Sequence, residues 1–478
     1  MSKQIVQKSN TSDWYDATLV DEKTSRLSGV IFFLLCAISI FAVLAFGAVD
    51  VWSLGLLSLF VGAAAVLWLA DSWTKKEISF NTNRLQIPFL GLITIGLIQL
   101  LPLRNLNIPT DLLPVPATQT LSLAPYTTRF AVVQLIIYFV FFALLLTLIN
   151  NQKRLRQTVL IVIIFGALMA FFGILQRLAG VEGVYGLREA ATNVKFASYI
   201  NQHHFAALME MTIGLSLALL FGKATNKDKR IFLIIAAAVM GIAILFTGSR
   251  GGLISLVAVL VFIVAANLLK KQGSGEKVSE SGEKSKNYRR NFTYVIGGLA
   301  VMFGLFGAVI MLGGDESLLR GVGLANPEEA SNGRLHFWQT ALKIISDYPI
   351  LGAGLDAFGV AFTRYDTWNG TSRVEQAHND YLQILADAGI LGFACVAAFI
   401  FLLFKQSLRI ITKTSDNFRR NVAVGALAGC FGILTHSFFD FPLRTPANGY
   451  FFLIFAALAT ASINYPKLYR KRARESTS

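Results

Sequence analysis

Charged residues are scarce in this chain of 478 residues. They make up 15% of it, whereas hydrophobic residues make up 54%; ordinary soluble domains have about 25% charged and roughly 45 to 50% apolar residues. The charges stand in short clusters between long apolar runs, which leaves too few of them to form a shell that faces water. The composition excludes a soluble enzyme and predicts a chain whose apolar runs face lipid.

Cysteine is rare as well. Cys36, Cys395 and Cys430 each stand inside an apolar run, which excludes a disulfide scaffold and a cysteine zinc site. The net charge of +15 would suit a nucleic-acid partner, but the basic residues stand at the ends of apolar runs and not along a basic face with aromatic residues. We therefore expect no nucleic acid partner, and the basic residues indicate orientation in a membrane.

Twelve apolar runs reach or approach the length that crosses about 30 Å of hydrocarbon. They predict an all-α polytopic membrane protein with both termini on one side. The first run begins at Leu27 after a polar stretch, so no cleavable signal peptide is expected. The runs lie near residues 28–48, 51–70, 86–103, 130–149, 157–177, 204–221, 231–247, 251–269, 292–312, 388–404, 421–438 and 448–464.

The loops between these runs differ in positive charge. One alternating set of loops and both ends carry 31 of the 43 Lys and Arg residues, and the other set carries 12. The richer side is predicted to be cytoplasmic. The predicted organisation is a cytoplasmic segment 1–27, nine helices in 28–312 with a cytoplasmic linker 270–291, an extracytoplasmic catalytic loop 313–387, three helices in 388–464 and a basic cytoplasmic tail 465–478.

All five histidines fall on or beside the outer side in this scheme. Histidine changes its charge most readily near neutral pH, so its concentration on one face together with arginines indicates a reaction site there. The alternative is that outer loops are simply more polar than spans. The histidines are His203, His204, His336, His378 and His436.

The outer loop contains an amphipathic segment, SNGRLHFWQTALKIISDYPILGAGLDAF (331–358). Leu335, Trp338, Leu342 and Ile345 recur at helical spacing, so the helix could lie in the headgroup plane with Trp338 at the interface. Arg334 would stand in its first turn. A contact of Arg334 with lipid headgroups is as well supported by this pattern as a catalytic role.

The segment EQAHNDYLQILADAGILG (375–392) runs from polar residues directly into a helical pattern. Asn379 or Asp380 can cap that helix. His378 would then stand at the N-terminal end, where the helix dipole favours the neutral ring that a general base requires. The alternative is a loop histidine bonded to backbone. A metal site of His378 and Asp380 is weaker, because no further ligand stands at a typical spacing.

A very short turn joins two spans in FTGSRGGLISL (246–256). Its glycines let the backbone come close to a ligand, and Arg250 places a planar, permanently charged group at the membrane surface. Amide groups of the helix that follows Gly251 would add donors for an anion. An arginine on the outer side of so short a turn is best explained by pairing with an anionic group.

Two further segments bring polar residues to the same side. FASYINQHHFAALMEM (196–211) places Glu210 about 9 Å below the mouth of a span. An acid at this depth is either functional or the partner of an outer arginine. The candidate supporting residues are Asn201, His203, His204, Glu210, Asn379, Asp380, His436 and Arg444, with Asp440 near the last two in THSFFDFPLRTPANGY (435–450).

Through INQHHFA, TGSRGG and the two segments of the outer loop, residues from about 160 to 460 resemble the O-antigen ligase and O-antigen polymerase superfamily of bacterial membrane glycosyltransferases. The resemblance implies an inverting, metal-independent transfer without a cofactor, from undecaprenyl diphosphate to an acceptor hydroxyl, at the outer face of the inner membrane. It implies that Arg250 and Arg334 hold the diphosphate and that His378 activates the acceptor. Gln202-His203 stands where related sequences often have Pro-Asn, which leaves the role of His203 open.

Several functions stay open at this point. A flippase or other transporter of lipid-linked glycans would also handle a diphosphate, but it needs charged residues along a path through the membrane, and the predicted spans are almost free of Lys and Arg. Ligase and polymerase differ in the acceptor, which is a glycan, lipid A core or a protein. Either would act in lipopolysaccharide or exopolysaccharide biosynthesis.

Overall fold

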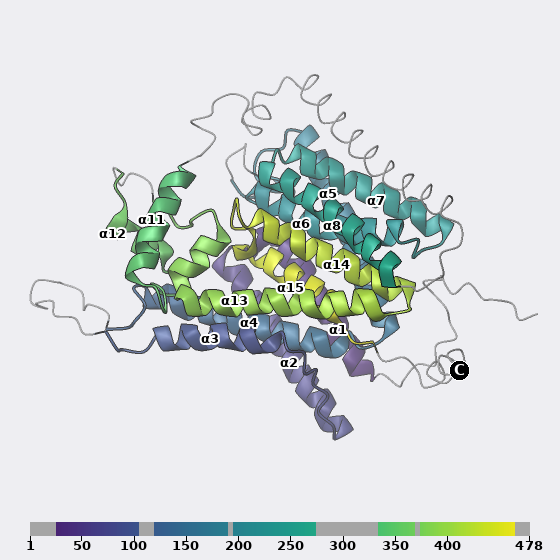
Figure 1. The fold of residues 1–478 in the computed structure, drawn as a ribbon, viewed down its shortest axis with the longest axis horizontal. Helices are drawn as coiled ribbons and strands as arrows, with labels where there is room; N and C mark the ends of the chain where they lie inside the picture. The colour runs from purple at the N-terminus through teal and green to yellow at the C-terminus, as the bar shows by residue number, and fades with distance from the viewer. Residues whose placement is uncertain (1–24, 105–118, 190–194, 274–332, 369–372, 464–478) are drawn as a thin grey trace, which may run out of the picture.

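The computed structural model describes residues 25–104, 119–189, 195–273, 333–368 and 373–463. These residues form α-helices and short 3-10 turns, with no β-strand in the described ranges. Most helices run along the longest axis of the molecule (Figure 1). The predicted all-α fold is confirmed for this part of the chain.

Eight helices in the described ranges are long and apolar enough to cross a membrane. The protein is therefore an integral membrane protein. These helices are α1 (Arg26–Leu44), α2 (Val51–Lys75), α4 (Pro125–Leu148), α5 (Gln152–Leu178), α6 (Gln202–Phe221), α7 (Lys227–Phe246), α8 (Arg250–Gly273) and α13 (Asp380–Lys413).

The predicted number of twelve spans is not established. The run 292–312 lies outside the described residues. The runs 86–103 and 448–464 form α3 (Gln86–Gln99) and α15 (Pro446–Thr460), of 14 and 15 residues, which at about 1.5 Å per residue are shorter than the hydrocarbon layer. The run 421–438 falls on α14 (Asn417–His436), which is not among the eight.

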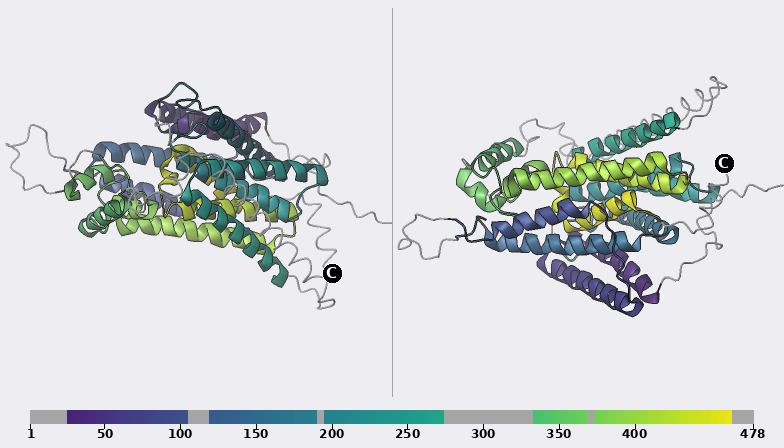
Figure 2. Two further views of the ribbon diagram at one scale, coloured as in Figure 1. Left: turned by 90° about the horizontal axis from the view of Figure 1, so that it is seen from above. Right: turned by 60° about the horizontal axis from the view of Figure 1, so that its bottom comes forward.

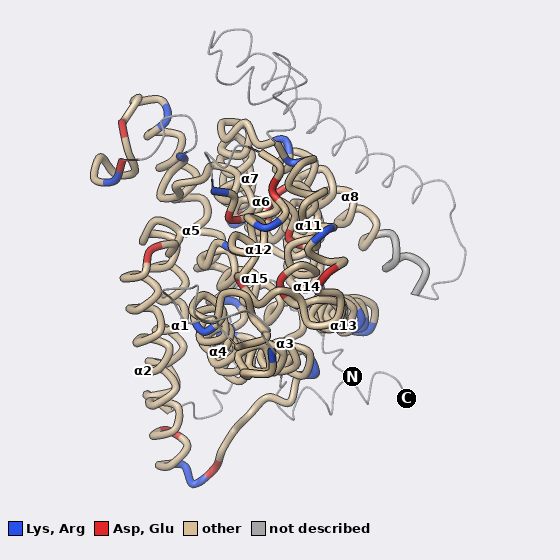
Figure 3. Tube along the Cα trace, turned by 90° about the vertical axis from the view of Figure 1, so that its left-hand side faces the viewer, with Lys and Arg blue, Asp and Glu red and all other residues tan. Residues whose placement is uncertain are grey.

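The centre of the bundle is the packing of α6 against α14. Both helices are buried on nearly every side. Small residues let their backbones approach closely: a Cβ added to Gly425 would lie 2.7 Å from Leu215 Cα, and one added to Gly429 would lie 2.7 Å from the Met211 carbonyl oxygen. Close backbone approach at small residues is the usual basis of helix association in membranes. By contrast, α2 stands at the edge of the bundle (Figures 1 and 3).

Buried arginines close the end of the bundle that lies opposite α11 (Arg334–Asp347) and α12 (Phe358–Tyr365). Arg419 donates to the carbonyl oxygens of Leu458 and Ala461 at 3.0 and 2.8 Å. Arg154 donates to the Leu148 carbonyl oxygen at 3.1 Å. These carbonyl groups stand at helix C-termini, where they lack intrahelical partners. The arginines therefore stabilise helix ends and do not line a path through the bundle.

At the other end, α11 and α12 pack beside the beginning of α13 in every view (Figures 1 and 2). The buried residues of α11 include Phe337, Ala341 and Ile344, whereas Leu335 is 62% exposed. Trp338 Nε1 donates to the Ala377 carbonyl oxygen at 3.0 Å. The indole N–H of Trp338 therefore has a partner inside the protein, and the location of Trp338 at the lipid interface stays a prediction.

The path of α13 is interrupted at Gly389, whose φ of +62° is the left-handed conformation that glycine tolerates. The loop after α11 satisfies the backbone groups at this break. The Ile390 N–H donates to the Pro349 carbonyl oxygen at 2.8 Å, and the Ala353 N–H donates to the Ala386 carbonyl oxygen at 2.8 Å. The loop and the helix therefore form one joint, which fixes α11 relative to α13.

Two side chains hold this joint to the rest of the bundle. Gln99 Nε2 on α3 donates to the Asp387 carbonyl oxygen at 2.8 Å, and its Oε1 accepts from the Leu355 N–H at 2.8 Å. Arg444, in the 3-10 turn η4 (Pro442–Arg444), pairs with the carboxylates of Asp387 and Asp356. Gln99 and Asp387 are fully buried and have partners, so these interactions hold the joint in one geometry.

Candidate active site

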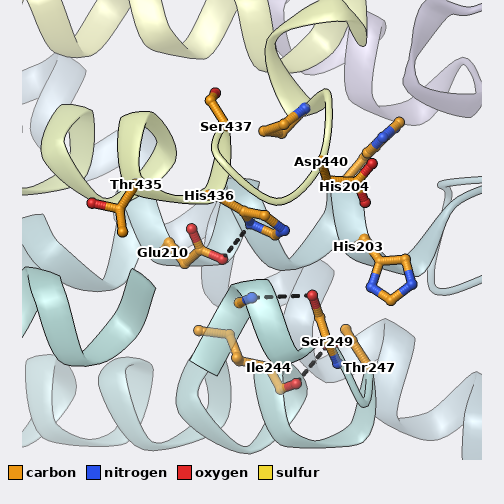
Figure 4. A network of polar contacts seen from close by, with 12 residues as sticks. His203, His204, Glu210, Ile244, Thr247, Ser249, Thr435, His436, Ser437 and Asp440 are labelled. Carbon is orange, nitrogen blue, oxygen red and sulfur yellow. Dashed lines mark hydrogen bonds and ion pairs between the residues drawn. The ribbon is translucent and has the colours of Figure 1, made fainter. Parts of the chain in front are cut away.

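Four helix N-termini and one loop segment meet at the end of the bundle beside α11. They are the N-termini of α6, α8, α11 and α13 and the segment that follows α14. His203, at the start of α6, lies within electrostatic range of Arg334, His378, His436 and Asp440. Figure 4 shows part of this cluster, with residues of α6 facing the segment after α14. The structure therefore brings together most of the residues that the sequence indicated.

The side chain of His378 points to Asp440. Its Nδ1 lies 3.0 Å from Asp440 Oδ1, and the two side chains are 31% and 3% exposed. Asn379 Oδ1 accepts from the N–H groups of Tyr381 and Leu382, at 3.0 and 3.1 Å. Asn379 is therefore the N-cap of α13, and His378 stands immediately before the helix as predicted.

Asp440 is a buried carboxylate. Burial raises its pKa, but the hydrogen bond with His378 and the neighbouring His204 and His203 outweigh burial, so the pKa of Asp440 is lowered from its usual value. The ionised carboxylate can only accept a hydrogen bond, so the ring nitrogen that faces it must carry a proton. We therefore assign a proton to His378 Nδ1. His378 Nε2, on the other edge of the ring, is then the nitrogen that can accept a proton.

Aromatic rings hold the imidazole of His378 from two sides. The Phe337 ring lies 5.9 Å away at 27°, and the Phe441 ring lies 4.7 Å away at 79°. The backbone of His378 has φ of +50°, which costs a non-glycine residue of order 1 to 3 kcal/mol and persists only where the surroundings enforce it. The ring is therefore fixed by packing as well as by Asp440.

Arg334 is the first residue of α11, directly after Gly333 with φ of +72°. Phe337, one turn later, is the residue that packs against His378. Within the described part of the chain, the buried Nε of Arg334 has no hydrogen-bond partner. An unused guanidinium donor beside the histidine cluster suits an anionic ligand.

Arg250 is the first residue of α8, which begins one residue before the predicted run 251–269. A Cβ added to Gly251 would lie 2.7 Å from His436 Nε2, so the start of α8 touches the histidine cluster. The Gly252 N–H donates to Ser249 Oγ at 3.1 Å (Figure 4). That amide is therefore used by the cap of its own helix and is not a donor to an anion, contrary to the prediction for the residues after Gly251.

Glu210 pairs with a histidine and not with an outer arginine. Its Oε1 lies 2.9 Å from His436 Nδ1, and neither side chain is more than 1% exposed (Figure 4). His436 in turn packs against Gly251. The pair therefore lies behind the turn that carries Arg250 and supports it from within the bundle.

Two of the predicted supporting residues, Asn201 and His204, lie at the start of α6. Asn201 caps α6 by accepting from the His203 N–H at 2.8 Å. His204 Nδ1 lies 2.5 Å from Thr445 Oγ1, and its Nε2 lies 3.4 Å from Asn201 Nδ2. Since both ring nitrogens have partners, His204 is a structural residue in this geometry.

Asp380 and Arg444 make contacts that connect α13 to other segments. Asp380 Oδ2 accepts from Ser437 Oγ at 2.8 Å, which ties α13 to the segment after α14. Arg444 is engaged by Asp356 and Asp387, so its charge is balanced inside the joint of α13. Both contacts therefore hold α13 to the segment that follows α14.

Sequence reasoning did not assign a role to Asp440, Phe337 or Phe441. One signal for Asp440 is present in the sequence. It is an acid between two phenylalanines at the mouth of an apolar run, and an acid in such surroundings requires a partner. The partner itself, 62 positions away, is visible only in the structure.

Comparison with known proteins adds a family. Residues 235–397 match a family model described as O-Antigen ligase, an interval that contains Arg250, Arg334 and His378. It is narrower than the resemblance read from the motifs and does not include Glu210, His436 or Asp440. No curated protein matches the chain. The match confirms the resemblance of the chain to the O-antigen ligase and O-antigen polymerase superfamily.

Proposed function

We propose that the protein is an inverting, metal-independent glycosyltransferase that moves a glycan from undecaprenyl diphosphate to an acceptor hydroxyl at the outer face of the bacterial inner membrane. The family match supports the reaction class. The observation that carries the proposal is the contact of His378 Nδ1 with Asp440, because a base needs both a free nitrogen and a group that orients it.

The reaction is a single displacement. The acceptor hydroxyl gives its proton to His378 Nε2 while its oxygen attacks the anomeric carbon of the lipid-linked sugar. The bond from that carbon to the diphosphate oxygen breaks, and attack from the opposite side inverts the configuration. Asp440 stabilises the imidazolium that forms, because its carboxylate stays ionised beside Nδ1.

The two arginines act on the leaving group. Undecaprenyl diphosphate gains negative charge as the bond breaks, and a guanidinium binds phosphate oxygens through a planar pair of donors. Arg334 lies one helical turn before Phe337, which packs on His378. Arg250 directly precedes Gly251, which contacts His436. Both start helices, so N-terminal helix dipoles add to their charge. Such a cationic site can balance the diphosphate without a metal ion.

The location at a bundle end fits this donor. Its diphosphate lies at the headgroup level of the bilayer, and the polar cluster stands where several apolar helices begin or end. The polyprenyl chain would stay in lipid beside the apolar helix surfaces. The proposed partners are this lipid-linked glycan, membrane lipid and an acceptor hydroxyl of a glycan, lipid A core or protein.

The test uses the purified full-length chain in lipid nanodiscs. It is incubated with undecaprenyl-diphosphate glycans, alone and with each candidate acceptor, and the products are measured by mass and ladder length. A single addition to a different acceptor would identify a ligase, and a ladder on the lipid-linked glycan would identify a polymerase. Movement of intact donor across a proteoliposome bilayer, with no glycan transfer, would contradict the proposal and favour the flippase.

A further inference from the structure

Trp368 is an exposed aromatic residue with an unusually fixed ring. One face of the indole stacks on His336, with centroids 4.3 Å apart and planes at 10°. Phe337 contacts it at 5.7 Å and 62°. Trp368 is nevertheless 49% exposed. The ring is thus held on one side and open on the other.

The support beneath the indole is itself well ordered. His336 Nε2 lies 2.8 Å from Asp366 Oδ1, and the Trp368 N–H donates to the same oxygen at 3.0 Å. Phe362 packs against His336 at 5.8 Å and 84°. Asp366 therefore fixes both the histidine under the ring and the backbone that carries it. A ring that served only to cover apolar neighbours would not need this polar support.

We propose that the open face of Trp368, supported by His336 and Asp366, is a carbohydrate subsite that stacks on a pyranose ring of the glycan. The face of an aromatic ring carries negative potential, and the C–H bonds on one face of a pyranose present the complementary positive edge. A tryptophan also gives a large contact area at low entropic cost, since it has two side-chain torsions. The Asp366 carboxylate beside the ring adds an acceptor for sugar hydroxyls.

The position of the ring fits a sugar remote from the reacting carbon. Phe337 lies between the two rings, 5.7 Å from Trp368 and 5.9 Å from His378. A Cβ added to Gly333 would lie 2.5 Å from Trp368, so the ring also borders the residue before Arg334. In a short oligosaccharide whose diphosphate is held at Arg334 and whose first sugar faces His378, a later sugar would lie over the indole. This inference rests on the proposed function.

The experiment measures sugar binding separately from transfer. The probe is the oligosaccharide released by mild acid from the lipid-linked glycans of the host, titrated into the full-length protein while tryptophan emission is recorded. We compare the wild type with Trp368→Phe and with Trp73→Phe, a matched control whose indole is 85% exposed on α2. We expect a saturable change in the wild type and in Trp73→Phe, and its loss in Trp368→Phe.

Kinetics give the second readout. Trp368→Ala should raise the KM for a donor with several sugars by about 3- to 10-fold, the magnitude of one aromatic contact, with a smaller effect on the rate at saturation. Donors that carry a single sugar should be unaffected. A rise in the KM of the acceptor instead would assign the stacked sugar to the acceptor glycan. If Trp368→Ala does not fold, Trp368→Leu, which keeps an apolar side chain without an aromatic face, provides the comparison.

The two proposals fail in different ways. Emission that responds to sugar in a protein without transferase activity would retain the subsite and reject the glycosyltransferase. Active transfer with an unchanged KM and unchanged emission in the Trp368 variants would overturn the subsite alone. A fall in the saturated rate with an unchanged KM would also overturn it, because the role of Trp368 would then be to pack α11.

Discussion

His378 and Asp440 lie 62 positions apart in the chain, and their side chains meet at 3.0 Å between Nδ1 and Oδ1. The histidine comes from the N-terminus of α13 and the aspartate from the segment after α14. Asp440 is almost fully buried, whereas His378 is partly exposed. In the proposed reaction this asymmetry gives them different tasks: Asp440 orients the ring and His378 reacts.

Asp440→Asn tests the orienting role. Because the pKa of Asp440 is lowered, its carboxylate is ionised beside His378 Nδ1. Asp440→Asn keeps the shape of the side chain but removes the charge that orients His378 and stabilises the imidazolium in the proposed reaction. The rate should fall by about 10- to 100-fold, as for other residues that orient a reacting group. An unchanged rate in purified Asp440→Asn would remove Asp440 from the mechanism.

His378→Ala should lower the rate by about 10² to 10⁴-fold, the usual contribution of a general base. Binding of the lipid-linked donor should change little, because the arginines remain. His378→Gln should not restore the rate, since an amide can hydrogen-bond the acceptor but cannot take its proton. Normal turnover in either variant, measured with purified enzyme, would make His203 the next candidate.

Arg334→Ala and Arg250→Ala should each reduce turnover strongly while the protein still inserts and folds. Lysine should rescue only partly, because an ammonium group lacks the planar pair of donors. Arg373→Ala is a matched control: this arginine pairs with Glu375 at a position where both side chains are more than half exposed, and such pairs contribute little. Near-normal product formation by Arg334→Ala would instead support the contact with lipid headgroups at that position.

Gln99→Leu tests the joint of α13. Gln99 is fully buried and serves the backbone groups of Asp387 and Leu355. In Gln99→Leu the Leu355 N–H loses its partner, whereas the Asp387 carbonyl oxygen keeps the Gly354 N–H as a donor. The unpaired N–H should cost about 1 to 3 kcal/mol. Thermal unfolding in detergent measures the loss, and Gln339→Leu on the exposed face of α11 serves as the control. Equal melting temperatures for the two variants would show that the joint does not depend on Gln99.

Labelling of single cysteines tests the predicted orientation. In a background without native cysteines, Thr367→Cys, near α12, should react with a membrane-impermeant reagent from outside the inner membrane. Thr412→Cys, at the other end of α13, should react only from the cytoplasm. Reaction of Thr367→Cys from the cytoplasmic side alone would reverse the topology and move every proposed catalytic residue with it.

Local features of the site could be predicted from the sequence. The N-cap at Asn379, the start of α11 at Arg334 and the start of α8 at Arg250 all depend on a few neighbouring residues. Capping and turn formation are local interactions, so the residues that make them stand within a few positions of each other. Segment length and hydrophobicity likewise indicate which stretches form membrane helices.

The sequence by itself therefore determined the all-α membrane class, the helix ends that carry His378, Arg334 and Arg250, and the resemblance to the O-antigen ligases. Only the tertiary structure decided the partners: Asp440 for His378, and His436 for Glu210. The physical reason is that a buried polar group must be satisfied by whichever group packing brings beside it. In a helical bundle that group comes from a segment that is distant in the chain, so no local sequence pattern identifies it.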